Sequence, residues 1–155
     1  MRLLATLATL AALLAILASC SGPKTIAPGP GAIAIVAPPP PDPYLVMIED
    51  RKDDLLRRLA TCESGGYGSS EKRIYGGNGL FHGRFQFMLR TLQGFVIDMD
   101  GRALTIKEAT DIAHDYEQAA VVAKYAIFER DAIGQWPLCA RKLGLHAEVR
   151  AIKSM

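Results

Sequence analysis

Glu63 is the side chain best placed for chemistry in this chain, because two cysteines and a tryptophan recur around it. It lies in the run CESGG at residues 62–66, and the run WPLC at residues 136–139 returns a second cysteine beside Trp136. In an oxidising compartment, Cys62 and Cys139 can form a disulfide that fixes the acid in a cleft. The alternative is a pair of free buried thiols.

A carboxyl group in such a place can act as a general acid. Cleavage of a glycosidic bond near neutral pH needs a proton donor whose pKa is raised toward about 6 by a dry, apolar setting. The candidates for that setting around Glu63 are Tyr67, Phe85, Phe87 and Trp136. The alternative for a lone glutamate at a helix end is a solvated surface residue.

A second carboxylate is harder to find in the sequence. Hydrolysis by two carboxylates needs the second acid about 5 to 9.5 Å from the first. Glu71 is the nearest in sequence and lies in a charged loop, while Asp98 and Asp100 look like residues of a turn at residues 98–101. None is compelling, which favours a route that uses Glu63 alone.

No metal site or cofactor is expected from the sequence. The pair Asp98 and Asp100 hints at calcium, but the third acidic position and the distal glutamate of an EF-hand loop are missing, so a turn is favoured. The three histidines, His82, His114 and His146, are widely spaced and follow no zinc-binding pattern.

The elements that must position Glu63 are mostly helical. Asp42 and Pro43 suit the cap and first turn of a helix that Gly65 stops, which places Glu63 at its C-terminus, where the helix dipole tends to raise a carboxyl pKa. Residues 67–87 are rich in glycine and aromatic residues and predict a short hairpin or an irregular loop. Further helices are expected over residues 87–96, 106–114, 116–130 and 137–143, the last of them being the final one. The expected fold class is therefore α+β and mostly helical, with one small core in residues 44–155.

Two segments precede this domain. Residues 1–19 resemble an export signal, with Arg2 before an apolar run that is too short for a comfortable membrane span. The run LASC at residues 17–20 resembles the lipobox of bacterial lipoproteins, which predicts acylation of Cys20; an ordinary cleaved signal and a retained anchor are the alternatives. Residues 20–43 hold eight of the nine prolines and predict a linker, with a proline-recognition ligand as the alternative.

The net charge and the expected cellular location limit the classes of molecule that can be partners of this protein. The formal net charge is +2, and no aromatic residues interleave with a basic run, which argues against a nucleic-acid partner. The expected location is the cell envelope, with the exported chain anchored to a membrane through lipid on Cys20.

Several short motifs also occur in a fixed order. They are LATCESGG at 59–66, GNG at 77–79, Gln86 and Phe87 with Thr91 beyond them, Glu117 with Gln118, and WPLCARKLG at 136–144. Together they cover nearly the whole domain and resemble the resuscitation-promoting-factor catalytic domain. That family has a lysozyme-like fold and acts on bacterial peptidoglycan in the manner of lytic transglycosylases.

The resemblance implies roles for single residues. Glu63 matches the catalytic acid of the family, Cys62 and Cys139 match its disulfide, and Thr91 and Gln118 fall on positions that hold sugar. Further candidates for substrate contact are Gln86, Asn78 and Trp136, although Trp136 also suits a core position and Gln86 a bond to the backbone of its loop.

The expected function is cleavage of the β-1,4 bond between MurNAc and GlcNAc in peptidoglycan. In the route that the resemblance implies, one glutamate protonates the leaving group and then helps the muramic acid 6-hydroxyl to close onto the anomeric carbon. The alternative is a non-catalytic peptidoglycan-binding lipoprotein that serves as a wall anchor.

Overall fold

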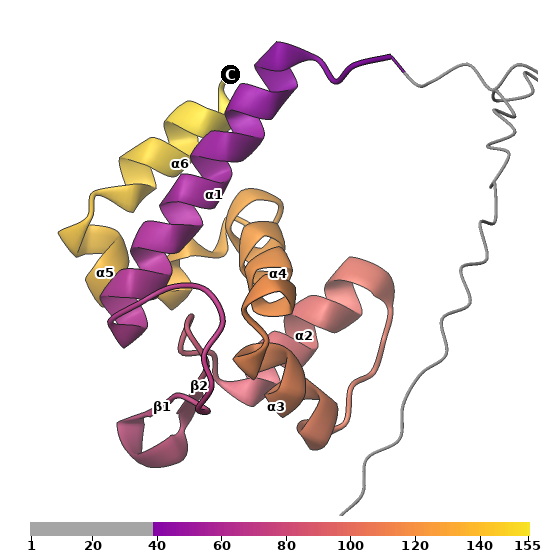
Figure 1. The fold of residues 1–155 in the computed structure, drawn as a ribbon, viewed down its shortest axis with the longest axis vertical. Helices are drawn as coiled ribbons and strands as arrows, with labels where there is room; N and C mark the ends of the chain where they lie inside the picture. Colours follow the sequence, from indigo (N-terminus) through magenta and orange to yellow (C-terminus); the bar gives the residue numbers. More distant parts are fainter. Residues whose placement is uncertain (1–38) are drawn as a thin grey trace, which may run out of the picture. The chain divides into compact units, whose positions relative to one another are not determined.

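The computed structural model describes residues 39–155, which form a unit of helices with one short hairpin (Figure 1). The elements in chain order are α1 (Pro43–Ser64), β1 (Tyr75–Gly76), η1 (Gly77–Gly79), β2 (Phe81–His82), α2 (Leu89–Asp100), α3 (Ile106–His114), α4 (Tyr116–Phe128), η2 (Ala132–Gln135), α5 (Pro137–Lys142) and α6 (Leu145–Lys153). The expected α+β, mostly helical class is confirmed. The export signal, Cys20 and most of the linker lie outside the described residues.

Helix α1 begins and ends as its sequence predicts. The Asp42 side chain accepts a hydrogen bond from the Tyr44 N–H, and Pro43 occupies the first turn, where no backbone donor is needed. At the other end, Gly65 adopts the left-handed conformation (φ 79°) and closes the helix with a bond from its N–H to the Thr61 carbonyl. Helix α1 therefore begins at Pro43, one residue before the position where the domain was expected to begin.

The helices enclose one apolar core. In Figure 1, α1 lies beside α5 and α6 on one side and beside α4 on the other, while α2 and α3 pack against α4. The fully buried large side chains come from α1, α2, α4, α6 and the segment after the hairpin, and they are Leu55, Leu56, Leu59, Phe85, Leu92, Val96, Ile127 and Leu145. Among residues 39–155, none of the helices combines the length and the apolar character that a membrane crossing requires.

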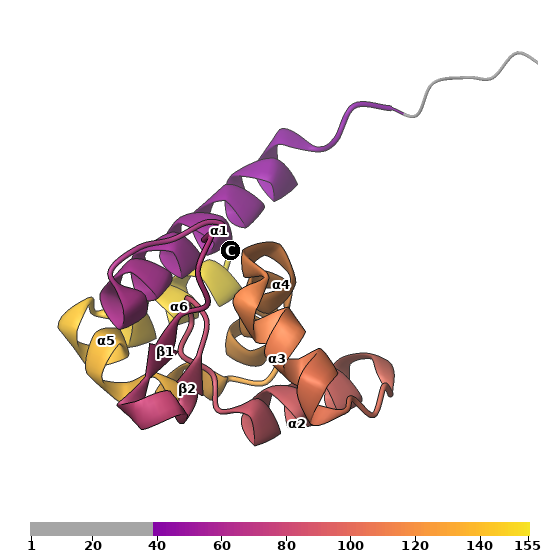
Figure 2. The same cartoon turned by 60° about the horizontal axis from the view of Figure 1, so that its bottom comes forward.

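The glycine-rich segment forms the predicted hairpin, which Figure 2 shows at one end of the domain. Its strands are two residues long and antiparallel, with Tyr75 opposite His82 and Gly76 opposite Phe81. The tip is the 3-10 turn η1, where Asn78 adopts a left-handed backbone conformation (φ 57°). Asparagine tolerates that conformation better than most residues, which suits a tight turn.

Two predictions about the helices are wrong. The expected turn at residues 98–101 is instead the last part of α2, which continues to Asp100 and ends only where Gly101 adopts a left-handed conformation (φ 76°). Helix α6 follows the helix that was expected to be the last one. Its buried residues, Leu145, Val149 and Ile152, follow helical spacing, so its periodicity was present in the sequence.

Candidate active site

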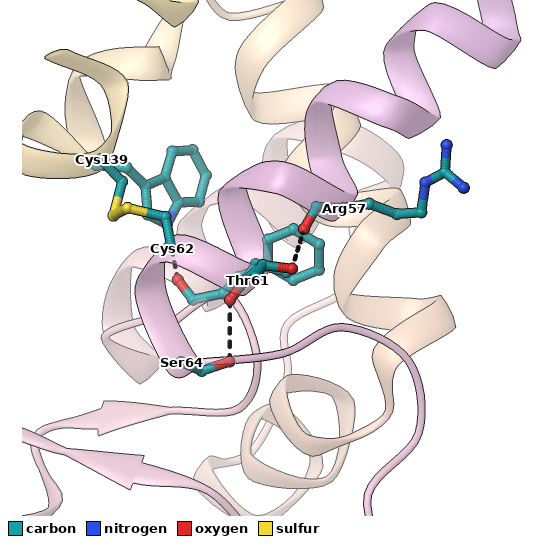
Figure 3. The surroundings of a disulfide bond; sticks show 8 residues. Arg57, Thr61, Cys62, Ser64 and Cys139 are labelled. Carbon is teal, nitrogen blue, oxygen red and sulfur yellow. Dashed lines mark hydrogen bonds between the residues drawn. A yellow bond between two sulfur atoms is a disulfide. The ribbon is translucent and has the colours of Figure 1, made fainter. Parts of the chain in front are cut away.

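Glu63 lies in the last turn of α1, and hydrogen bonds from side-chain hydroxyls to backbone carbonyls stabilise this end of the helix. The Ser64 hydroxyl donates to the carbonyls of Ala60 (3.0 Å) and Gly66 (3.2 Å). One turn earlier, the Thr61 hydroxyl donates to the Arg57 carbonyl at 2.8 Å, a bond that Figure 3 shows. The backbone around Glu63 is therefore ordered by local contacts before any tertiary contact is considered.

A disulfide joins this turn to α5. The sulfurs of Cys62 and Cys139 lie 2.05 Å apart, and 77 positions of sequence separate the two residues (Figure 3). The structure thus joins the two cysteines that the expected pairing names. Because Cys62 directly precedes Glu63, the bridge fixes the backbone next to the candidate acid.

The Glu63 carboxyl is partly buried, and burial raises its pKa above the ordinary value for glutamate. Within residues 39–155, no hydrogen bond or salt bridge engages this carboxyl group. Desolvation without a positive partner favours the protonated acid over the carboxylate. A carboxyl group of this kind can donate a proton at a higher pH than an exposed glutamate can.

The expected apolar residues are mostly in the core. Phe85, Phe87 and Trp136 are each at most 3% exposed, whereas Tyr67 is 57% exposed. The Phe87 and Trp136 rings meet edge to face with centroids 5.4 Å apart, and the Trp136 indole N–H donates to the Phe85 carbonyl at 2.7 Å. Trp136 is thus a core residue with a satisfied polar atom, which is one of the two roles that its sequence allowed.

The structure brings three of the predicted substrate-binding residues together. Gln86, Thr91 and Trp136 line one small cavity of about 50 Å³. That volume suits a water molecule or two rather than a sugar ring. The Gln86 side-chain nitrogen already donates to the Gly83 carbonyl at 2.7 Å, so Gln86 holds its own loop, as its alternative role anticipated.

Asn78 and Gln118 are separate from that cavity, and both are exposed. Asn78 lies at the hairpin tip, and Gln118 lies in the first turn of α4. There the Asp115 carboxylate caps the helix by accepting from the Gln118 N–H (3.0 Å) and from the Gln118 side-chain amide (2.9 Å). No contact in the structure tests whether any of these residues binds sugar, so that role stays a prediction.

The three candidates for a second carboxylate are all exposed. Glu71 lies in the loop after α1, and Asp98 and Asp100 lie in the last turn of α2. Asp98 forms a salt bridge with Arg130 (3.2 Å), and Asp100 forms one with Arg102 (2.8 Å). A hydrogen bond from Arg102 holds the pKa of Asp100 below its usual value. In the part of the chain that the structure describes, no three histidine, cysteine, aspartate or glutamate side chains are grouped as metal ligands.

Two surface hollows were not anticipated from the sequence. The larger, of about 920 Å³, lies between α1 and α4, and within it Lys124 forms salt bridges with Glu49 (3.1 Å) and Asp53 (2.5 Å). The other, of about 560 Å³, borders Cys62 and is lined partly by basic side chains. Glu63 lines neither of them. Alternating charges on an exposed helix face are the expected pattern for solvent contact, so nothing in the sequence marked either hollow.

Comparison of the chain with models of protein families, with curated proteins and with solved structures finds no match.

Proposed function

We propose that this protein cleaves the glycan strand of peptidoglycan, with Glu63 as its one catalytic carboxyl group. The observation that carries the proposal is the setting of that carboxyl, which is partly buried, has a pKa raised by burial and lacks a positive partner within residues 39–155. The disulfide next to it supports the proposal further, because a general acid must be held in position to act.

The proposed reaction begins with proton transfer from Glu63 to the glycosidic oxygen of the leaving sugar, and the bond from that oxygen to the anomeric carbon of muramic acid breaks. The Glu63 carboxylate then takes the proton of the 6-hydroxyl of the same muramic acid. The 6-oxygen bonds to the anomeric carbon, which yields a 1,6-anhydro end and restores the acid. No water is consumed. This route is favoured because Glu71, Asp98 and Asp100 are exposed and two of them are ion-paired.

A wall-binding module without turnover is the second candidate. One observation favours it: Glu63 lines none of the three hollows described above, so none of them would hold a sugar against the candidate acid. A binder would retain wall fragments on the protein, whereas an enzyme would release them.

The test of the proposed function is Glu63→Gln, with Glu71→Gln as the matched control in an exposed loop. Gln keeps the shape of the side chain but has no acidic proton to transfer. We therefore expect the rate at which purified peptidoglycan is cleaved to fall by about 10²- to 10⁴-fold or more. Glu71→Gln should cleave at the wild-type rate. Mass analysis of the released fragments measures both, and anhydro ends are the expected product.

The stability of Glu63→Gln provides an independent check. Because the folded pKa of Glu63 is raised, its ionisation weakens the fold as the pH rises through that pKa. Gln does not ionise, so the variant should be at least as stable as the wild type at pH 7.

In the cleavage test, reducing ends in the products would point to hydrolysis, and cleavage by Glu63→Gln at the wild-type rate would overturn the assignment.

We also propose that the chain is exported and acylated at Cys20, which would place the domain at a membrane beside the wall. The change Cys20→Ala should move the protein from the membrane fraction to a soluble or unprocessed form. Fractionation and lipid labelling measure this. Unchanged fractionation together with no difference in lipid label would contradict acylation at this residue.

A further inference from the structure

The base of the hairpin is fastened to the C-terminal turn of α3 by a small set of polar contacts. Arg73 forms a salt bridge with Asp111 (2.7 Å), and the Ile74 N–H donates to Nδ1 of His114 at 3.3 Å. His82 lies on β2 beside His114, with ring centroids 5.7 Å apart. We call these five residues, Arg73, Ile74, His82, Asp111 and His114, the hairpin latch.

The contact at Ile74 fixes the protonation state that the latch requires. An imidazole nitrogen accepts a hydrogen bond only when it carries no proton, so His114 must be neutral with its proton on Nε2. Protonation of His114 places a second N–H on Nδ1, which then faces the Ile74 N–H. Two donors then face each other, and the bond that holds Ile74 is lost.

The surroundings of the two histidines also favour their neutral forms. Within residues 39–155, Nδ1 of His82 and Nε2 of His114 are buried and have no hydrogen-bond partner. Tyr75 packs its ring edge-on against both, with centroids 5.3 Å from His82 and 4.8 Å from His114. An imidazolium in either half-buried ring would place a charged N–H at a buried nitrogen that has no acceptor.

The charged groups that face the pair are Arg73 from the loop before β1 and Asp111 from α3. Burial lowers the pKa of His82, with the Gly79 backbone opposing that effect and Arg73 adding to it. Burial also lowers the pKa of His114, and Arg73 and His82 add to that effect while Asp111 opposes it. Protonation of the two histidines in acid is therefore opposed by their burial and by the positive charge of Arg73.

We propose that the hairpin latch is a pH-sensitive switch: it holds the hairpin on α3 while His114 and His82 are neutral, and their protonation releases the hairpin base. The released segment runs from Arg73 toward the hairpin tip, where Asn78 lies. The release itself stands apart from the proposed function. Its consequence for wall cleavage, a loss of activity in acid as the hairpin opens, rests on that function.

The test measures amide hydrogen exchange of the full-length protein between pH 7.5 and pH 5.5, corrected for the intrinsic pH dependence of exchange. Opening that takes up one proton becomes about tenfold more favourable for each pH unit below about 6.5, until the folded histidine also titrates. We therefore expect protection of the Ile74 and hairpin amides to fall by about tenfold at pH 5.5. Protection of the α1 and α4 amides should change far less.

Two variants separate the latch from other acid effects. His114→Asn keeps an acceptor oxygen near the place of Nδ1 but does not titrate in this range, so hairpin protection should lose most of its pH dependence. His146→Asn changes the exposed histidine of α6, outside the latch, and should behave as the wild type does. Equal pH dependence in all three proteins would overturn the proposal.

A wild-type measurement covers the case in which His114→Asn fails to fold. The NMR shifts of the Ile74 amide should titrate together with the His114 ring, because one accepts from the other. An Ile74 amide that does not follow the ring also overturns the proposal. If cleavage is absent at every pH while protection still falls in acid, the proposed function fails and the latch stands. If cleavage occurs while protection does not depend on pH, the latch fails and the function stands.

Discussion

The candidate site is held by two joints of opposite chemistry. At the end of α1, the Cys62 to Cys139 disulfide is covalent, and the Trp136 indole bond to the Phe85 carbonyl lies in the core. We call these four residues the bridge joint. At the hairpin, the latch depends on an exposed salt bridge and on neutral histidines. Acid and salt therefore act on the latch much more than on the bridge joint.

The comparison separates the two parts of the candidate site. Glu63 lies beside the bridge joint, and so does Gln86, which follows Phe85, whereas Asn78 lies on the hairpin. The proposed acid is thus next to the joint that resists pH, and one predicted sugar contact, Asn78, lies on the hairpin that the latch holds. A change in pH can move that proposed contact while the proposed acid stays in place.

The largest expected effect breaks the bridge joint. In the chain-entropy description, a disulfide that closes a loop of 77 positions stabilises the fold by roughly 4 to 5 kcal/mol, as an upper figure. We expect Cys62→Ser combined with Cys139→Ser to lower the free energy of unfolding by most of that amount at every pH from 5.5 to 7.5. Denaturant titration measures it. A loss below 1 kcal/mol would contradict this account.

The second largest effect is expected from a substitution at Gly83, beside the hairpin, with Gly79 as the matched control. Gly83 adopts a left-handed conformation (φ 72°), and a methyl group on its Cα would lie 1.6 Å from the Ala113 carbonyl oxygen of α3. We expect Gly83→Ala to destabilise the protein by about 2 to 4 kcal/mol, because backbone strain and overlap add. Gly79→Ala has a similar φ (89°) but open space around it, so only the strain of about 1 to 2 kcal/mol applies. Equal losses in the two variants would argue against close packing of Gly83 on α3.

A third change removes one hydrogen bond from the bridge joint. Trp136→Phe leaves the buried Phe85 carbonyl without its donor, which costs about 1 to 3 kcal/mol. The control is Leu138→Ala, two positions away and 71% exposed, which should cost less than about 0.5 kcal/mol. Thermal unfolding followed by circular dichroism measures both. Similar losses for the two variants would mean that the indole bond contributes little.

Most of the helical framework could be predicted from local signals. Asp42 and Pro43 mark the start of α1, and helical spacing marks α3 over the bounds that it has in the structure. The end of α2 was missed because Asp98, Met99 and Asp100 look like turn residues when read alone. Their place in a helix depends on Met99 packing against the core and on Gly101 as the cap, and the first of these is a tertiary contact.

The candidate site was predictable in its residue types but not in its contacts. Glu63 and the cysteines are marked by their neighbours in sequence. The use of Gln86 and Trp136 as donors to backbone carbonyls depends on how the loop at residues 83–86 packs, which no spacing rule encodes. The hairpin latch was also missed, because His82 and His114 are 32 positions apart and meet only when the hairpin packs on α3.

The smallest expected effect on stability, and the sharpest test of the comparison, comes from Arg73→Gln. Both partners of the Arg73 to Asp111 salt bridge are exposed, so its loss should leave the midpoint of unfolding at pH 7.5 nearly unchanged. The effect in acid should differ. Arg73 lowers the pKa of both His82 and His114, so its removal raises both pKa values toward their ordinary range.

The sign of that effect follows from the histidines. A histidine whose folded pKa is depressed contributes its full stability above about pH 6.5 and loses it as the pH falls toward the folded pKa. Raising the folded pKa brings it closer to the pKa of the unfolded chain. The free energy of unfolding of Arg73→Gln should therefore fall less in acid than that of the wild type. Acid-driven opening of the hairpin should weaken in the same way, so protection of the Ile74 amide should fall by less between pH 7.5 and pH 5.5 than in the wild type. Lys107→Gln is the control, because it removes the other salt bridge to Asp111 while Arg73 stays. Exchange at the Ile74 amide between pH 7.5 and pH 5.5 measures the loss of protection. A loss in Arg73→Gln that is as large as in Lys107→Gln would show that charge near the latch does not set its response.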